Sequence, residues 1–126
     1  MRYSYRVESD ALWVWDNTRN AIFWHGKPDS EAVLEVLAIP EQDDCLVLLN
    51  FHAGLGNQIY GLPRNLARIR PDGTIAWQQG GPDTAAADPY TAFEWQEKEL
   101  SVFSWSCHLC IVDVETGKIT SSIFTK

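Results

Sequence analysis

The sequence has few cysteines and no long apolar segment. Cysteine occurs only at Cys45, Cys107 and Cys110, and so small and odd a number does not suit the disulfide framework of a secreted domain. The longest apolar run, residues 45–50, is too short to span a membrane, and the N-terminus lacks the apolar stretch of a signal peptide. We therefore expect a cytoplasmic protein with reduced thiols and no membrane partner.

Basic residues are also scarce relative to acidic ones. The chain has 10 Lys and Arg against 17 Asp and Glu, so its formal net charge is −7. Nucleic-acid binding normally needs a basic face. We therefore expect no nucleic-acid partner, unless the arginines gather on one face: Arg2, Arg6, Arg19, Arg64, Arg68 and Arg70. The acid excess has two interpretations: that it only keeps the protein soluble, which we favour, or that it steers a basic protein partner toward the chain.

No motif supplies a complete metal or redox site. Cys107 and Cys110 form a C-x-x-C, but a structural zinc ion needs two further ligands and the sequence has no second pair. Side chains three positions apart in a strand point to opposite faces, so the two sulfurs would not converge. Free thiols are the favoured interpretation, and we expect no metal and no cofactor.

Catalytic motifs are missing as well. The sequence has no G-x-S-x-G elbow, and Cys107 and His108 are neighbours that point apart in a strand. The G-L-G fragment at residues 54–56 lacks the lysine and the helix of a phosphate-binding loop. The carboxylate pairs Asp43–Asp44 and Glu97–Glu99 fall in expected turns. The sequence therefore predicts no catalytic residue and favours a protein that is not an enzyme.

What the chain has in quantity is apolar and aromatic residues. Of its 126 residues 45% are hydrophobic and 12% are aromatic, and six are tryptophan. This composition is typical of a globular protein rather than a disordered one. A chain of this length is expected to form a single domain, residues 1–126, around one real core.

Short apolar segments separated by turn signals predict an all-β fold. The first three form a ribbon within residues 1–28, in which Leu12 and Val14 point one way and Trp13 and Trp15 the other. The whole set predicts an antiparallel meander of roughly ten strands, formed by residues 2–7, 11–15, 21–24, 30–39, 45–50, the hairpin 65–77, 91–95, 100–105, 109–114 and 119–124.

Residues 30–39 are the one ambiguous stretch. Ser30 suits the cap of a helix, with Val33, Leu34 and Leu37 on one face. The segment is also short, rich in Val, Leu and Ile, and ended by Pro40, which suits a strand that returns through a turn as residues 45–50. We predict a strand here.

A repeat relates the hairpin at Asn65–Trp77 to the segment Cys110–Ile119. The turn glycines of the two segments, Gly73 and Gly117, lie 44 residues apart. A period in the low forties is typical of stacked four-stranded β units. We therefore predict a first blade-like repeat at residues 30–80 and a second at residues 88–126.

The first repeat contains about ten extra residues, at positions 52–61, and a loop inserted into a repeated scaffold is a common place for binding residues. We predict contacts with a partner from the following polar and aromatic residues: His52, Asn57, Gln58, Tyr60 and Arg64.

The tryptophans are the second candidate feature. Trp77, Trp95 and Trp105 fall in strands of the repeats, and we expect them in the core. Trp13 and Trp15 share a face that one small sheet does not cover fully, so we add them to the candidate binding residues. Two interpretations stay open for this pair: a core or dimer interface, and a platform on which a sugar ring stacks.

The pattern N-L-A-R-I-x-x-D-G-T-I-A-W, followed by Y-T-A-F-E-W, L-S-V-F-S-W-S and I-V-D-V-E-T-G-K-I, resembles β-propeller blades. It resembles in particular a group of small, uncharacterised bacterial proteins built on such repeats, over residues 32–126. The resemblance implies an immunity-like or accessory role in a mobile bacterial gene set, and no catalytic residue carries over. Two blades and a ribbon are too short to close a propeller, so we expect a sandwich-like or barrel-like arrangement.

Three hypotheses for the function follow. The first is a non-enzymatic protein that binds a protein partner of basic character. The alternatives are a module that binds a small molecule or carbohydrate through exposed tryptophan, and, last, a small hydrolase. A homodimer formed through an edge strand is a separate prediction, because pairing removes an exposed edge.

Overall fold

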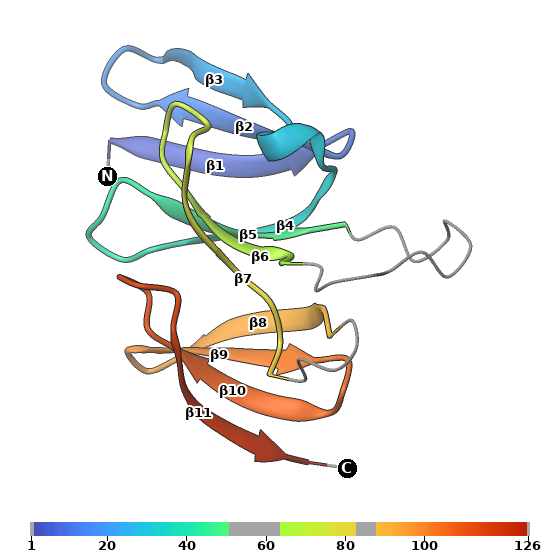
Figure 1. Ribbon diagram of the computed structural model, residues 1–126. Coiled ribbons are helices and arrows are strands. Elements are labelled where there is room, and N and C mark those ends of the chain that lie inside the picture. Colours follow the sequence, from blue (N-terminus) through green and yellow to red (C-terminus); the bar gives the residue numbers. More distant parts are fainter. Residues whose placement is uncertain (1, 51–63, 83–87, 126) are drawn as a thin grey trace. The chain divides into compact units, whose positions relative to one another are not determined.

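The computed structural model describes residues 2–50, 64–82 and 88–125, and in these ranges the chain is all-β (Figure 1). Eleven strands form three antiparallel sheets, none of which is closed within the described ranges. The helical content of these ranges is one 3-10 turn, η1 (Pro28–Ser30). No helix in this part of the chain is long and apolar enough to cross a membrane. The predicted all-β meander is confirmed.

The first sheet contains three strands, β1 (Tyr3–Glu8), β2 (Ala11–Asp16) and β3 (Ala21–Gly26), in that order. Ser9 and Asp10 join β1 to β2 with φ angles of 51° and 62°. Two successive residues with positive φ are typical of the tight turn that matches the twist of a hairpin. This turn places Glu8 opposite Ala11 and so determines every other pair along the two strands.

The second sheet contains β4 (Val33–Ala38), β5 (Cys45–Leu49), β6 (Leu66–Ile69) and β7 (Ile75–Gln79), in that order. The ambiguous segment after Ser30 is thus a strand, as predicted, and β4 pairs antiparallel with β5. All five residues of β5 are buried, because this central strand is covered on both faces.

The chain forms two compact units, and the first comprises residues 1–50 and 67–77. In this unit the inner face of the first sheet packs against the second sheet (Figure 1). The packing is apolar, and Leu12 and Val14 of β2 are completely buried. The core consists of Tyr3, Leu12, Val14, Val33, Cys45, Val47, Leu49, Ala67 and Ile69.

The second unit comprises residues 51–66 and 78–126 and contains the third sheet. Its strands are β8 (Tyr90–Gln96), β9 (Glu99–Ser104), β10 (His108–Val112) and β11 (Ile119–Phe124), and they lie in sequence order. One face of this sheet is buried, and its central residues are exposed by 2% or less: Leu100, Val102, Cys110 and Val112.

The turn glycines of the predicted repeat have equivalent conformations. Gly73 and Gly117 have φ angles of 87° and 79°, in the left-handed region that favours glycine. An aspartate stabilises each turn. The Asp72 carboxylate accepts hydrogen bonds from the backbone N–H of Thr74 at 3.0 Å and from its hydroxyl at 2.6 Å. The Asp113 carboxylate accepts one from the backbone N–H of Glu115 at 2.9 Å. Local turn chemistry therefore forms both hairpins.

Candidate binding face on the first sheet

The face of the first sheet that points away from its core carries both tryptophans singled out in the sequence. The hairpin places Trp13 opposite Arg6 and Trp15 opposite Ser4, and the β2–β3 pairing places His25 beside Trp13. We call this surface the outer face. It consists of two cross-strand rows, Arg6–Trp13–His25 and Ser4–Trp15–Ile22.

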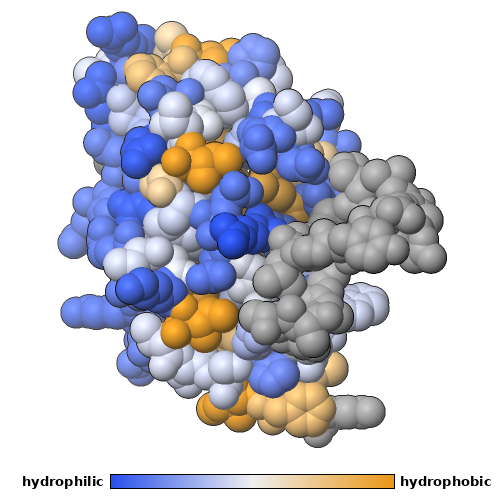
Figure 2. Space-filling view, in the orientation of Figure 1, coloured by the Kyte–Doolittle hydropathy of each residue, from blue (hydrophilic) through white to orange (hydrophobic). Residues whose placement is uncertain are grey.

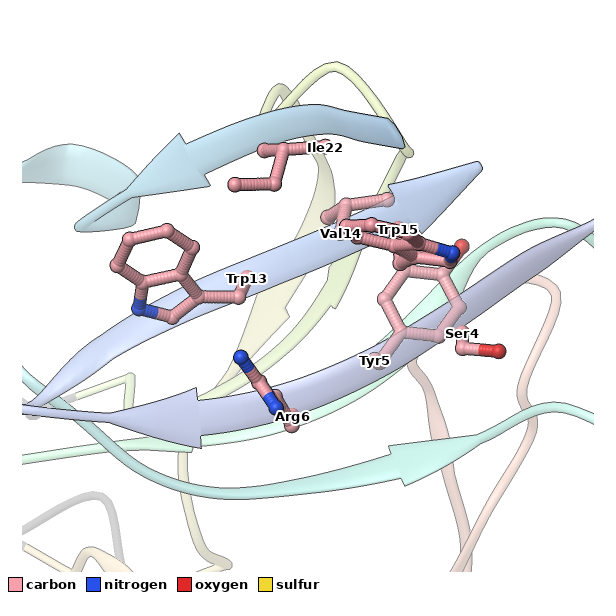
Figure 3. Close-up of a pocket in the computed structure, with 7 residues that line it drawn as sticks. All are labelled: Ser4, Tyr5, Arg6, Trp13, Val14, Trp15 and Ile22. Carbon is pink, nitrogen blue, oxygen red and sulfur yellow. The ribbon is translucent and has the colours of Figure 1, made fainter. Parts of the chain in front are cut away.

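A groove of about 400 Å³ runs over the outer face (Figure 3). Figure 3 shows Trp13 and Arg6 toward one end of the strands and Trp15 and Ser4 toward the other. This volume lies in the range of small-molecule sites, and a mostly apolar lining is typical of them. The lining residues are Ser4, Tyr5, Arg6, Trp13, Val14, Trp15 and Ile22.

Two contacts orient Trp13 within the groove. Its indole stacks on the His25 imidazole, with ring centroids 4.3 Å apart and planes inclined by 8°. Its Nε1–H points to the Glu8 carbonyl oxygen at 3.4 Å, at the end of β1. An aromatic ring fixed on one face and at its polar edge loses little conformational entropy when a partner covers it.

Trp15 and Ile22 leave more apolar surface exposed. Trp15 is 38% exposed and Ile22 is 50% exposed, and a β-bulge between Val14 and Trp15 shifts the pairing with β3 at this point. The neighbouring Phe23 is 43% exposed, although its ring contacts Tyr3 at 5.1 Å. Figure 2 shows apolar atoms at the surface over this sheet, at the top of the view. Phe23 thus belongs to the inner side of the sheet, whereas Trp15 and Ile22 are neighbours on the outer face, and neighbouring exposed apolar side chains mark interaction surfaces.

Arg6 supplies a positive charge on the outer face. Its guanidinium lies 3.2 Å from the Glu8 carboxylate, and both side chains are largely exposed. An exposed ion pair is screened by solvent and holds its partners only weakly. Arg6 can therefore exchange Glu8 for an acidic group of a partner.

The position of Arg6 could have been predicted from the sequence, because the alternation of β1 and the two-residue turn place Arg6 beside Trp13. Ile22 depends on the bulge, which the sequence did not indicate.

The predicted loop residues are not part of the outer face as described. His52, Asn57, Gln58 and Tyr60 lie outside the described residues. Arg64 is exposed, and its backbone carbonyl accepts a hydrogen bond from the Gln78 side chain at 3.2 Å. The structure thus brings together Trp13 and Trp15 from the predicted set, and the role of the other five stays a prediction.

The expectation that Trp105 is a core residue is wrong. Trp105 is 69% exposed, because β9 ends at Ser104 and the chain turns before β10. The Trp105 N–H donates to the Pro89 carbonyl at 2.8 Å, and Cys107 turns the chain with a φ of 65°. Alternation along a strand no longer applies once the strand has ended. The other two tryptophans expected in the core, Trp77 and Trp95, are partly buried.

A polar network that the sequence did not indicate supports this turn. Asp88 is completely buried; its carboxylate accepts hydrogen bonds from the Ser106 N–H at 2.8 Å and the Ser106 hydroxyl at 2.6 Å. The same hydroxyl lies 2.7 Å from Nδ1 of His108 and 3.0 Å from the Ser104 hydroxyl. In a Ser-His-Asp triad the imidazole lies between the other two groups, whereas here the hydroxyl does. This arrangement holds the turn to the segment before β8.

The three cysteines are free thiols in different environments. Cys45 and Cys110 are completely buried, and burial raises the pKa of each thiol. Cys107 is partly exposed in the turn before β10. Within the described ranges no group of three or more His, Cys, Asp or Glu side chains lies close enough to hold a metal ion.

These features define a small all-β protein with blade-like sheets and an exposed aromatic face. The chain belongs to the family described as "Domain of unknown function (DUF7957)", whose model matches residues 30–124. That match begins after β3, so the outer face lies outside it.

A solved structure shows the same type of fold. The chain is similar to a β-propeller protein, in "The crystal structure of BamB from Moraxella catarrhalis", with 11% sequence identity and a TM-score of 0.58. The likeness covers 96% of this chain and 32% of that one, so the chain spans about a third of the length of BamB. At this identity the likeness shows the fold alone. No curated protein matches the chain.

Proposed function

We propose that this chain is a non-catalytic binding protein that recognises a protein partner with the outer face of its first sheet. The observation that supports this most directly is the exposure of Trp15 and Ile22 beside the fixed ring of Trp13. Tryptophan and arginine are the residues most enriched among those that dominate binding energy at protein interfaces. The outer face presents both kinds within a single groove.

The character of the surface also favours a protein partner. Exposed apolar side chains alternate with Ser4 and Arg6, which gives an apolar centre with polar neighbours. Such a composition is typical of protein interfaces.

An immunity-like or accessory role in a mobile bacterial gene set is the most concrete form of this proposal. The resemblance to small bacterial proteins with blade-like repeats supports it. The net charge of −7 favours a basic partner through electrostatic steering.

The test compares variants of the outer face with a matched control. Trp15→Arg and Ile22→Arg each place a charge in the groove, whereas Leu34→Arg makes the same kind of change at a 51% exposed position of β4. Each tagged protein is used to capture partners from the lysate of the native host, with quantitative mass spectrometry. We expect one dominant partner with the wild type and with Leu34→Arg, and at least a tenfold loss with the two outer-face variants. Equal capture by all four proteins would overturn the proposal.

A carbohydrate or other small ligand is the second candidate, and the volume of the groove favours it. Tryptophan rings stack on the apolar faces of sugars, and Trp13 is already held in a fixed orientation. The measurement is the tryptophan fluorescence of the wild type titrated with a panel of glycans and metabolites, repeated with Trp15→Leu. A saturable change that Trp15→Leu removes would support this candidate over the first. An unchanged spectrum across the panel would count against it.

A further inference from the structure

The first sheet has one strand fewer than the other two. It consists of β1, β2 and β3, whereas the second and third sheets each contain four strands. A β-propeller protein is similar to this chain, and propeller blades are four-stranded sheets. Within the described ranges no strand pairs with the free edge of β1 or with that of β3 (Figure 1). A fourth strand can therefore join the first sheet only at one of these two edges.

The composition of the two edge strands favours β3. Its sequence, A-I-F-W-H-G, contains no Asp, Glu, Lys, Arg or Pro. The strand at the other edge, β1, carries Arg6 and Glu8. Charged side chains and proline are the devices by which natural edge strands avoid pairing with another chain. An uncharged and largely apolar edge such as β3 is suited to accept a further strand.

Apolar side chains are exposed on both sides of the sheet along β3. Ile22 on the outer face is 50% exposed, and Phe23 on the inner side is 43% exposed despite its contact with Tyr3. A partner that only lies over the outer face would cover Ile22 and leave Phe23 exposed. A strand placed alongside β3 directs its side chains alternately to the two sides of the sheet and so covers both residues. The two exposures together favour a partner at the edge.

The β1–β2 hairpin determines which backbone groups of β2 point toward β3. Ser9 and Asp10 form a two-residue turn, so the flanking residues Glu8 and Ala11 exchange backbone hydrogen bonds. Along antiparallel strands such pairs alternate with pairs that make no hydrogen bond. The backbone groups of Ala11 and of every second residue after it therefore point to β1. Those of the residues between them point to β3.

His25 consequently presents its backbone at the free edge. Leu12 and Val14 direct their backbone groups toward β3, where they pair with Gly26 and Trp24. His25 lies between these two residues of β3, so its N–H and C=O point away from β2. The β-bulge in this pairing lies before Trp24, so the edge is regular around His25. Unpaired N–H and C=O groups of this kind are the ones that an added strand engages.

We infer that the partner of the outer face binds by adding an extended segment to the free edge of β3, so that the first sheet gains a fourth strand. This inference rests on the proposed function, because it names how the partner of the same surface is held. Main-chain hydrogen bonds to His25 supply affinity. Apolar side chains on both sides of the segment cover Ile22 and Phe23. The occupant is therefore an extended, largely apolar segment of a partner protein.

The probe for the experiment is a phage-displayed library of random peptides of roughly 12 residues, which is long enough for one strand. The library is selected on the folded full chain, and the affinity of the enriched peptides is measured by fluorescence polarisation. We expect peptides rich in apolar and β-branched residues and poor in proline, because proline cannot donate to a ladder of hydrogen bonds. A selection that enriches no such peptide would overturn the inference.

A pair of variants at His25 tests the backbone contact. His25→Ala and His25→Pro both remove the imidazole that stacks on Trp13, but only the proline also removes the N–H at the free edge. An edge strand tolerates proline where the N–H faces away from the sheet. We expect His25→Pro to bind the selected peptides at least about tenfold more weakly than His25→Ala, because a peptide carbonyl loses its donor. Equal affinities of the two variants would overturn the inference.

Two further variants test the contacts on either side of the sheet. Ile22→Arg on the outer face and Phe23→Arg on the inner side are each expected to weaken peptide binding at least about tenfold. Leu34→Arg, at a 51% exposed position of the edge strand β4, is expected to bind as the wild type does. Circular dichroism spectra establish that each variant is folded. Binding that is insensitive to Phe23→Arg would show that the peptide lies over the outer face alone, which would overturn the inference.

Light scattering distinguishes a partner segment from a second copy of the chain. A mass of 14.3 kDa for the purified wild type means that β3 is free to receive the segment, as the inference requires. A dimer that persists in His25→Pro uses another surface and also leaves β3 free. A dimer that His25→Pro returns to 14.3 kDa would make a second copy the occupant and overturn the inference.

The inference and the proposed function fail on different results. If Trp15→Arg lowers the capture of the partner from the lysate while His25→Pro and His25→Ala capture it equally, the inference fails and the proposed function stands. Equal capture by the outer-face variants and Leu34→Arg is the result that overturns the proposed function itself.

Discussion

Gly73, in the turn between β6 and β7, lies directly against the indole of Trp24 on β3. A Cβ atom added to Gly73 would fall inside van der Waals contact of Cε2 and Cζ2 of that ring. Gly73 also has a φ of 87°, which side chains rarely adopt. One glycine therefore serves both the local turn and the packing of the second sheet against the first.

Replacement of Gly73 by alanine is expected to lower the free energy of unfolding by about 2–4 kcal/mol, because it combines backbone strain with a forced shift of the Trp24 ring. Urea denaturation measures the change. In a Trp24→Leu background the alanine is expected to cost less, since the smaller side chain gives way while the cost of the positive φ remains. Equal costs in the two backgrounds would show that the ring contact does not contribute.

The ion pair between Arg68 and Asp44 is nearly enclosed. Nε of Arg68 donates to Asp44 Oδ2 at 2.8 Å, with side-chain exposures of 9% and 19%, and Arg68 also donates to Gln42 at 2.5 Å. Asp44→Ala is expected to destabilise the protein by about 2–4 kcal/mol, because it leaves a buried cation without its carboxylate. The double variant Asp44→Ala/Arg68→Met is expected to be more stable than the single one.

The exposed pair of Arg6 and Glu8 is the matched control for that prediction. Its groups lie 3.2 Å apart, with side-chain exposures of 69% and 52%. Glu8→Ala is expected to change the free energy of unfolding by less than about 1 kcal/mol, because solvent screens the pair. Equal effects of Glu8→Ala and Asp44→Ala in urea denaturation would contradict the argument from burial.

Asp16 gives the protein a specific pH dependence. Burial by itself raises the pKa of this carboxyl. Hydrogen bonds from the backbone N–H groups of Arg19 and Thr18, together with the charge of Arg2, outweigh burial and hold the pKa below its ordinary value of 3.8. A lowered pKa in the folded state stabilises the protein at pH values above the unfolded pKa, and this contribution is lost as the pH falls through the folded pKa.

The melting temperature of Asp16→Asn, compared with that of the wild type, tests this dependence. The wild type is expected to be the more stable near pH 6, and the difference is expected to shrink as the pH falls through the folded-state pKa of the carboxyl. Asp10→Asn, at an exposed position in the β1–β2 turn, serves as the control. A difference that stays constant from neutral to acid pH would contradict the role of the Asp16 charge.

The thiols are expected to differ in reactivity. A disulfide reagent such as Ellman's reagent attacks the thiolate, and burial both shields Cys45 and Cys110 and raises their pKa values. In the native protein one thiol per chain is expected to react quickly, and Cys107→Ser is expected to remove that phase. The other two are expected to react at least about 100-fold more slowly, through transient opening. Rapid labelling of Cys45 would contradict the burial of β5.

Much of the fold could be predicted from the sequence because it depends on neighbouring residues. The alternation in residues 11–15 predicted that Leu12 and Val14 share one face of the strand and Trp13 and Trp15 the other. The structure buries the first pair and leaves Trp15 exposed. Turn chemistry at Gly73 predicted the β6–β7 hairpin. The strand at residues 33–38 followed from its β-branched composition and from Pro40. In each case a period of two or a single turn residue contains the information.

Features that depend on distant contacts could not be predicted in this way. Trp105 has the alternation of a core residue, but hydrogen bonds of its turn to Asp88 and Pro89 place it outside the strand. The groove needs the β2–β3 bulge, which brings Ile22 beside Trp15. The sequence by itself thus determined the strands, the turns and the direction of each tryptophan in β2, because these follow from local backbone geometry. The tertiary structure alone decided that Ile22 meets Trp15 on the outer face, because the bulge in the β2–β3 pairing sets that register.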